Sequence, residues 1–243
     1  MKSKLILGTA ILGYAVTVSI ASSDMQISPP VKSPETVKTA NLTGPANFQV
    51  SQDIQVLENS QYTAYFNKSM RSAIATFEVL SPEDFTNPYV RDAKFIKDPR
   101  VLNSPRPEEY TNTGFDRGHL SAASNTTNPK FIKETFLMSN IVPQAKSLNR
   151  GLWKTLETFA KFKALRSNVK VTNGVVYKNC EQPSKIGNLP VPDYMFKIIQ
   201  IEGNLPQAWL FPNSDKLSAH LEDYQIDPAK LPALCGVRIP SKY

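Results

Sequence analysis

Asp116-Arg117-Gly118-His119 is the stretch from which both the fold and the function of this chain can be inferred. His119 is one of only two histidines in 243 residues, and histidine is the side chain whose ordinary pKa lets it take up and release a proton near neutrality. We therefore predict that His119 is a general base. Arg117 is a candidate for binding a phosphoryl oxygen, whereas Asp116 beside it is predicted to be a structural ion-pair or turn residue.

The segment downstream predicts a helix over 149–165, because apolar residues recur there at helical spacing. Asn149 and Glu157 share a second face of that helix. The amide oxygen of Asn149 suits a magnesium ion that keeps most of its own water. Glu157 lies about 12 Å of helix rise further on, so we predict that its carboxylate holds a metal-bound water rather than the ion itself. With His119 as the base, these groups fit metal-assisted hydrolysis of a phosphodiester.

Alternating apolar residues and turn signals predict the other elements of the fold. A β-hairpin is expected over 61–67 and 73–80, and a long functional loop over 87–114. The further strands are expected at 136–142, 169–177, 195–201 and 208–211, with a helical turn after Ser81 and short helices at 129–135 and 228–234. Strands mixed with segregated helices predict an α+β domain whose central sheet, mixed or antiparallel, is flanked by helices.

The N-terminal segment predicts export. Residues 1–21 have the basic start, apolar middle and small-residue end of a secretory signal peptide, with an uncleaved membrane anchor as the alternative. Residues 22–50 are predicted to be a flexible tail rich in Pro, Ser and Thr, and 51–243 to be one globular domain. We expect a secreted or periplasmic protein with no stable membrane partner once the signal is cleaved. A membrane-anchored protein and the mitochondrial intermembrane space are the alternatives.

The two cysteines, Cys180 and Cys235, are predicted to pair, because an exported chain with an even cysteine count usually forms disulfides. Closing a loop of that length stabilises a fold by about 4 kcal/mol on the chain-entropy model. The alternative is two buried free thiols in a reducing compartment.

The formal charge of +7 is compatible with a polyanionic partner and also with an ordinary soluble protein. Cations that contact phosphates give affinity without sequence preference. The alternative for the basic residues of the helix is a solvated face. The candidate phosphate-binding residues are Arg91 and Lys94 in the long loop, and Lys146, Arg150, Lys154, Lys161 and Lys163 along the helix.

Three segments in this order and spacing resemble the DNA/RNA non-specific endonucleases, the ββα-metal nucleases that include endonuclease G. Trp153, in the third segment, is predicted to pack in the core rather than to stack on a base. The resemblance covers roughly residues 60–215. The segments are Gly114-Phe115-Asp116-Arg117-Gly118-His119-Leu120, Ser139-Asn140-Ile141-Val142-Pro143-Gln144 and Leu148-Asn149-Arg150-Gly151-Leu152-Trp153 followed by Leu156-Glu157.

The resemblance implies a role for each matched residue. It makes His119 the general base, Asn149 the sole direct protein ligand of Mg²⁺, with Mn²⁺ as a substitute, and Glu157 the residue that holds metal-bound water. Asn140 would orient the catalytic residues, and Arg117 would contact the phosphate. The family also has a second phosphate-binding basic residue upstream of the motif, for which Arg91 and Lys94 are the two candidates.

We therefore predict an exported, magnesium-dependent endonuclease with a ββα-metal active site that cleaves DNA and RNA with little sequence preference. The resemblance further implies a homodimer and a protein inhibitor as partners. The alternative hypothesis is a catalytically impaired protein of the same fold that binds nucleic acid or an inhibitor, motivated by the unassigned upstream basic residue.

Overall fold

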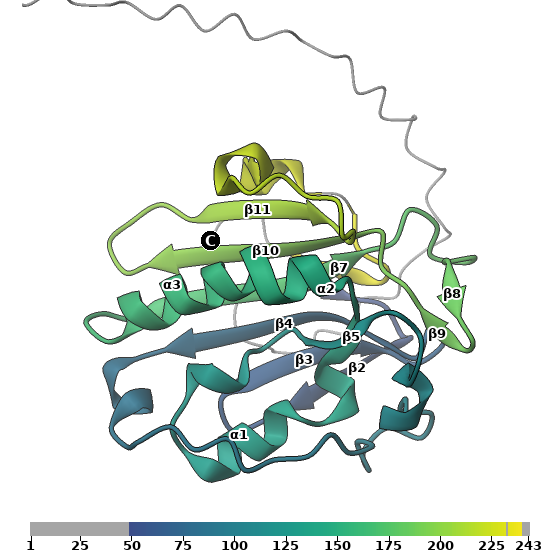
Figure 1. Ribbon diagram of the computed structural model, residues 1–243, viewed down its shortest axis with the longest axis horizontal. Coiled ribbons are helices and arrows are strands. Elements are labelled where there is room, and N and C mark those ends of the chain that lie inside the picture. The colour runs from purple at the N-terminus through teal and green to yellow at the C-terminus, as the bar shows by residue number, and fades with distance from the viewer. Residues whose placement is uncertain (1–48, 232, 240–243) are drawn as a thin grey trace, which may run out of the picture. The chain divides into compact units, whose positions relative to one another are not determined.

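The computed structural model describes residues 49–231 and 233–239, so the predicted signal peptide and residues 22–48 of the predicted tail lie outside the described residues. The domain is built on a seven-stranded antiparallel sheet with strand order β12-β11-β10-β7-β4-β3-β2 (Figure 1). The predicted α+β class with an antiparallel central sheet is confirmed. The strands of this sheet are β2 (Ile54–Glu58), β3 (Tyr62–Asn67), β4 (Ser72–Leu80), β7 (Val169–Val176), β10 (Tyr194–Ile201), β11 (Gln207–Pro212) and β12 (Gln225–Ile226).

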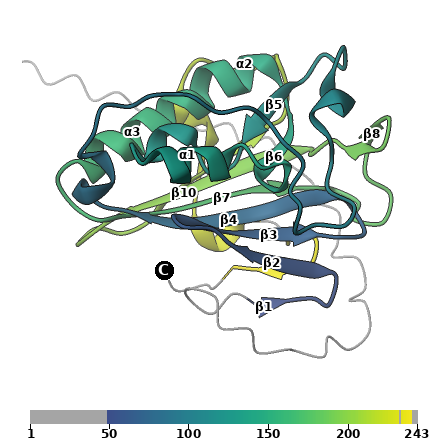
Figure 2. The ribbon, with the colours of Figure 1, turned by 90° about the horizontal axis from the view of Figure 1, so that it is seen from below.

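The helices cover one face of the sheet. They are α1 (Pro129–Thr135), α2 (Lys146–Leu148) and α3 (Lys154–Ala164), and Figure 2 shows all three above the sheet together with the short strands β5 (Asp116–His119) and β6 (Ile141–Gln144). The apolar stripe of α3 and the turn before it packs in one buried cluster with the central strands. Within the described part of the chain, no helix is long and apolar enough to cross a membrane.

Several predicted elements are confirmed where local signals are strong. The expected hairpin forms as β3 and β4, which pair antiparallel. The helical turn expected after Ser81 is η1 (Pro82–Phe85), with proline at its start. Helix α1 begins where predicted, because the side chain of Asn128 accepts a hydrogen bond from the backbone nitrogen of Lys130, at 3.0 Å.

Short elements complete the domain. Strands β5 and β6 pair as a two-stranded ribbon. Two further ribbons pair β1 with β13 and β8 with β9. The remaining elements are β1 (Gln49–Val50), β8 (Lys185–Ile186), β9 (Leu189–Pro190), β13 (Val237–Arg238), η2 (Pro107–Tyr110), η3 (Ala123–Asn125), η4 (Met138–Asn140), η5 (Asn149–Trp153), η6 (Leu221–Tyr224) and η7 (Pro228–Lys230).

Other local predictions were wrong in detail or incomplete. The strand expected at 136–142 is a helical turn, η4, followed by β6, because Asn140 uses its side chain to hold backbone groups of neighbouring segments. The helix expected at 228–234 is only the short turn η7. Strand β2 was not predicted, and β1 lies within the end of the segment 22–50 that was predicted to be a flexible tail.

The helix expected over 149–165 is not one regular helix. It begins earlier, at Lys146, and widens into a π-helical turn, η5, before α3 starts at Lys154. Gly151 has φ −105° and ψ −110°, outside the helical region, at the point where the two helical segments meet. Trp153 is fully buried, as predicted. A π-turn changes which residues share a face, so the sequence pattern alone could not place Asn149 correctly relative to Glu157.

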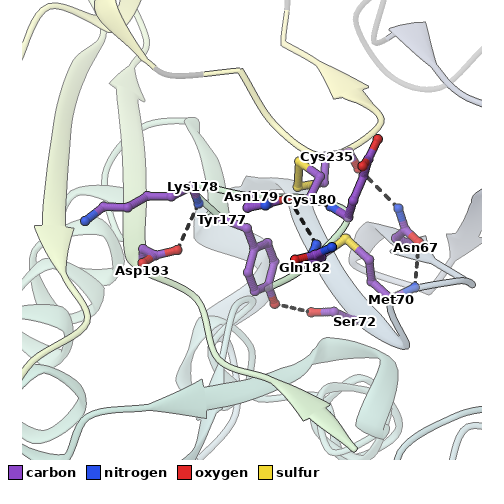
Figure 3. Close-up of a disulfide and its surroundings, with 11 residues drawn as sticks. Asn67, Met70, Ser72, Tyr177, Lys178, Asn179, Cys180, Gln182, Asp193 and Cys235 are labelled. Carbon is purple, nitrogen blue, oxygen red and sulfur yellow. Dashed lines mark hydrogen bonds between the residues drawn. A yellow bond between two sulfur atoms is a disulfide. The ribbon is translucent and has the colours of Figure 1, made fainter. Parts of the chain in front are cut away.

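The predicted disulfide between Cys180 and Cys235 is confirmed, with 5.5 Å between the two Cα atoms (Figure 3). Cys180 follows β7, and Cys235 precedes β13, so the bond ties the C-terminal segment to the central sheet. The carbonyl oxygen of Cys235 also accepts a hydrogen bond from the side chain of Asn67 on β3, at 3.4 Å. The bond therefore secures a terminal segment whose own strand, β13, pairs with β1 and not with the central sheet.

Removing this disulfide is expected to lower the free energy of unfolding by about 2–4 kcal/mol, because the unfolded chain regains the freedom of a long closed loop. The change is the double variant Cys180→Ser with Cys235→Ser, compared with the wild type in urea with and without reductant. Reductant should destabilise the wild type and leave the double variant unchanged. Equal unfolding midpoints for oxidised and reduced wild type would contradict the expectation.

Candidate active site

The β5–β6 ribbon carries the motif Asp116-Arg117-Gly118-His119, which forms strand β5. Gly118 pairs with Val142, and His119 with Ile141. A Cβ atom on Gly118 would lie 2.2 Å from Oε1 and 2.5 Å from Cβ of Gln144, which is fully buried. Glycine is therefore required because a neighbouring side chain occupies the space in which any other residue would place its own.

His119 lies in an aromatic environment at the end of β5. Its ring centroid is 5.4 Å from that of Phe95 and 4.9 Å from that of Phe136. Burial, aided by the positive charge of Arg91, lowers the pKa of His119 from 6.5 to about 3. Among the described residues, its buried Nε2 atom has no hydrogen-bond partner. The imidazole is thus neutral at physiological pH and has a free nitrogen that can accept a proton.

Two buried residues hold the backbone around His119. The indole nitrogen of Trp153 donates to the carbonyl oxygen of His119 at 3.2 Å. Asn140 accepts a hydrogen bond from the backbone nitrogen of Ser121 and donates to the carbonyl oxygens of Ser121 and Thr135, each at 2.9 Å. Both the oxygen and the nitrogen of the Asn140 side chain are thereby used by the backbone, and Asn140 does not line the groove.

Asp116 holds the start of the helical segment against the ribbon. It accepts hydrogen bonds from the side-chain nitrogen of Asn149 at 2.9 Å and from two nitrogens of Arg150, each at 2.8 Å. The resulting ion pair with Arg150 lowers the pKa of Asp116. Because the nitrogen of Asn149 is held by Asp116, the amide is oriented and its carbonyl oxygen remains available to a ligand.

Glu157 lies on α3 in a half-buried position facing the same groove as Asn149. Burial raises its pKa to about 7, and the nearby Lys197 is the main influence that opposes this rise. Its carboxylate therefore gains stability from any additional positive charge nearby, as a bound cation would supply.

A row of buried polar side chains crosses the sheet beneath α3. Lys197 on β10 donates to the side-chain oxygen of Asn173 on β7, and its Nζ lies 4.1 Å from the ring centroid of Trp153. Glu78 on β4 accepts hydrogen bonds from Ser121 at 2.9 Å and from Asn125 at 3.0 Å, and Asn173 approaches it at 3.4 Å. The row therefore links three strands of the sheet to the segment that follows His119.

The charged side chains of this row influence one another's pKa values. Burial raises the pKa of Glu78 to about 7, and burial lowers the pKa of Lys197 to about 8, while Glu157 and Glu78 both favour the charged lysine. Sequence reasoning missed both Glu78 and Lys197. The available signal was a charged residue within an otherwise apolar strand, which in an antiparallel sheet usually indicates an exposed position.

One groove of about 640 Å³ brings most of the predicted site residues together. His119, Asn149 and Glu157 line it. The basic residues that line it are Arg91, Arg117, Arg150, Lys154 and Lys161.

Four of the predicted residues do not line the groove, namely Asn140, Lys94, Lys146 and Lys163. Of the two upstream candidates, Arg91 lies in the groove, with its guanidinium carbon 5.1 Å from the ring centroid of Phe136. Lys161, one of the helix cations predicted to contact phosphates, also lines the groove, one helical turn beyond Glu157.

Two of the groove's arginines already have partners. Arg117 donates to the carbonyl oxygen of Pro107 at 3.0 and 2.8 Å, and its guanidinium carbon lies 5.5 Å from the ring centroid of Phe95. Arg150 is held by Asp116 although its side chain is 67% exposed. Both side chains are fixed in direction, which reduces the entropy that binding a phosphate would cost.

The donors in the groove fit a weakly held, hydrated cation. No group of three or more His, Cys, Asp or Glu side chains among the described residues could hold a metal ion directly. Asn149 offers one neutral oxygen, and Glu157 offers a carboxylate. This is the donor set expected for Mg²⁺, which keeps several of its waters and needs few protein ligands.

Comparisons with known proteins agree with this geometry. The family model for DNA/RNA non-specific endonucleases matches residues 42–241. Human mitochondrial endonuclease G is 30% identical over 164 residues, which cover 61% of this chain and 55% of that protein. Nuclease C1 of Cunninghamella echinulata var. echinulata is 32% identical over 163 residues, which cover 60% and 64%. The chain spans about half the length of the endonuclease G relatives it matches.

A solved structure has the same fold. The crystal structure of the EndoG/EndoGI complex, described as showing the mechanism of EndoG inhibition, matches with a TM-score of 0.62 and 26% sequence identity. The match covers 71% of this chain and 80% of that one.

Proposed function

Because the chain belongs to the DNA/RNA non-specific endonuclease family, we propose that it is an endonuclease that hydrolyses phosphodiester bonds of DNA and RNA with little sequence preference. The observation that carries this proposal is the convergence of His119, Asn149 and Glu157 on one groove lined by five basic residues. A groove of this kind holds the backbone of a nucleic acid through its phosphates, which are the same for every sequence.

His119 acts as the general base in this proposal. Its neutral imidazole takes a proton from a water molecule through Nε2 as the water oxygen attacks the phosphorus atom. A bond forms between phosphorus and the water oxygen while the bond from phosphorus to the leaving oxygen breaks, and the leaving oxygen takes up a proton from water. No covalent enzyme intermediate is formed. We propose that Trp153 and Asn140 are positioning residues, because Trp153 holds the carbonyl oxygen of His119 and Asn140 holds the backbone of Ser121 two residues further on.

Members of this family are metal-dependent nucleases, and we propose Mg²⁺ as the ion, with Mn²⁺ able to replace it. Asn149 would hold it directly and Glu157 through water. When bound, the hydrated ion supplies positive charge that stabilises the departing oxygen. Asp116 supports the site by fixing the amide of Asn149 with the carbonyl oxygen available. Burial raises the pKa of Glu157, and a bound cation nearby would favour the ionised form of this carboxylate.

The basic residues of the groove orient the substrate and stabilise charge on the phosphoryl oxygens. We propose Arg117 and Arg91 for the phosphate that is cleaved, because both lie in the same groove as His119. Arg150, Lys154 and Lys161 follow one another along the helical side of the groove and would contact phosphates further along the strand. Lys94 and Lys146 remain candidates for weaker contacts outside the groove.

The disulfide supports export, because such bonds persist in oxidising compartments. We propose a secreted or periplasmic location for the mature chain, with the mitochondrial intermembrane space as the alternative suggested by relatives named as mitochondrial. The similarity to an EndoG/EndoGI complex makes a protein inhibitor a proposed partner. A homodimer remains a further prediction.

Plasmid nicking tests the proposal and distinguishes it from a protein that only binds nucleic acid. The wild type should convert supercoiled plasmid to nicked and then linear DNA in Mg²⁺, and excess chelator should stop the reaction. Asn149→Ala should lower the rate by about 100-fold or more at low Mg²⁺, since it removes the direct ligand. Asn188→Ala, an exposed asparagine outside the groove, is the matched control. Intact plasmid in the presence of Mg²⁺ would support the binding protein instead.

A further inference from the structure

The far end of the groove has a different chemical character from the rest. Near the C-terminal end of α3, it is lined by Tyr89, Phe162 and Leu165. These side chains are 38%, 54% and 46% exposed, respectively. Exposed apolar residues that gather in a groove commonly mark a binding surface, whereas single exposed ones need no explanation. Phosphate binding by cations does not account for aromatic rings at this place.

Each aromatic ring stands beside a cation. The Nζ atom of Lys161 lies 5.4 Å from the ring centroid of Tyr89, and the guanidinium carbon of Arg166 lies 5.5 Å from that of Phe162. Cation–π contacts hold each ring on one side and leave the exposed surface available for another planar group. Aromatic rings interleaved with cations form the usual surface for a single nucleic-acid strand, because bases stack on the rings while the cations follow the phosphates.

The spacing along α3 fits the same strand that would be cleaved. Phe162 lies five positions after Glu157, which corresponds to about 7–8 Å of helix rise. A nucleic-acid strand advances about 3.4 Å per nucleotide. Along the helix axis, Phe162 therefore lies about two nucleotides beyond Glu157, and both side chains line the same groove, so that one strand can contact both.

We propose that Tyr89 and Phe162 form a stacking subsite for unpaired bases, so that the groove binds single-stranded nucleic acid more tightly than duplex. The subsite deepens the nuclease function proposed above and rests on it. In a regular duplex the faces of the bases are covered by their neighbours, and only ends, loops and single strands offer an exposed base to a ring.

Binding measured without metal and without cleavage tests the subsite. The probes are a fluorescent oligothymidine and a duplex of the same length, titrated with purified protein in excess chelator. Phe162→Ala should weaken binding of the single strand by about 10-fold, since stacking contributes on the order of 1–3 kcal/mol per base, and should change duplex binding by less than about 2-fold. Leu205→Ala is the control, because Leu205 is 87% exposed and lies outside the groove.

Two further variants separate stacking from a general apolar contact. Phe162→Trp keeps an aromatic ring and should restore single-strand binding, whereas Phe162→Leu keeps apolar area without a π-face and should not. The slope of log affinity against log salt should stay unchanged in Phe162→Ala and become shallower in Lys154→Ala, since only the latter removes a phosphate contact.

The outcomes are distinguishable. If the wild type binds neither probe, the proposed nuclease function fails together with the subsite. If the wild type binds and Phe162→Ala binds the single strand equally well, only the subsite is refuted. If Phe162→Leu restores binding as well as Phe162→Trp, or if Phe162→Ala converts a dimer to a monomer in sedimentation, the surface serves a protein contact and the stacking proposal is overturned.

Discussion

Replacing His119 by alanine is expected to lower nuclease activity by about 10²–10⁴-fold, the range that a positioned general base contributes. The fold should survive, because the hydrogen bond that Trp153 makes in this region goes to the backbone of His119 and not to its side chain. Activity is measured by plasmid nicking in Mg²⁺, and folding by circular dichroism and thermal unfolding. His220→Ala is the matched control, since His220 is the other histidine and is exposed.

The mechanism would be refuted by His119→Ala cleaving plasmid at the wild-type rate while His220→Ala also remained active. A folded His119→Ala variant that still binds DNA would separate the loss of chemistry from the loss of binding. Binding in chelator should be within a few-fold of the wild type, because the phosphate-binding cations remain in place.

The same substitution should change how stability depends on pH. The pKa of His119 is about 3 in the folded protein and 6.5 as its ordinary value. Between these values the unfolded chain binds a proton at this position that the folded protein does not bind. His119 therefore costs stability as the pH falls below 6.5. In His119→Ala, the unfolding free energy should decline less steeply from neutral pH towards acid pH, as measured by urea unfolding at a series of pH values.

Replacing Lys197 by methionine is expected to lower the free energy of unfolding by about 3–5 kcal/mol, the range for removing one partner from a buried charged group. The methionine fills a similar volume, so the effect reports the lost charge. Asn173 loses its donor, and the carboxylates of Glu78 and Glu157 lose the positive charge that favours their ionised forms. Unfolding in urea measures the change. Lys170→Met on β7 is the matched control, because Lys170 is exposed on the same sheet.

Lys197→Met should also weaken metal binding, because a protonated Glu157 is a poorer partner for a hydrated cation. The readout is the Mg²⁺ concentration that gives half-maximal plasmid nicking, measured at a temperature where the variant is folded. The requirement should rise at pH 7 and recover partly at pH 8.5, where Glu157 regains its charge. An unchanged Mg²⁺ requirement with reduced stability would mean that Lys197 serves the fold alone.

Local patterns predicted those parts of the fold in which a residue's conformation depends on its neighbours in the chain. The hairpin of β3 and β4 follows from a period of two and a short turn, and α1 follows from the Asn128 cap and Pro129. The irregular turn at Gly151 could not be predicted in this way. Its conformation depends on how the helical segment is held by Asp116 at one end and by the sheet along its length.

The sequence by itself determined which residues are candidates for the reactive groups, because His119, Asn149 and Glu157 lie in motifs whose residue types and spacing suit one chemistry. Only the tertiary structure decided that Arg91 and not Lys94 reaches the groove, and that Lys197 lies buried beneath it. The physical reason is that the chemistry of a motif depends on its residue types and on their separation along a short stretch of sequence. Which loop cation enters a groove, and which strand residue is buried, depends on packing between segments far apart in the chain.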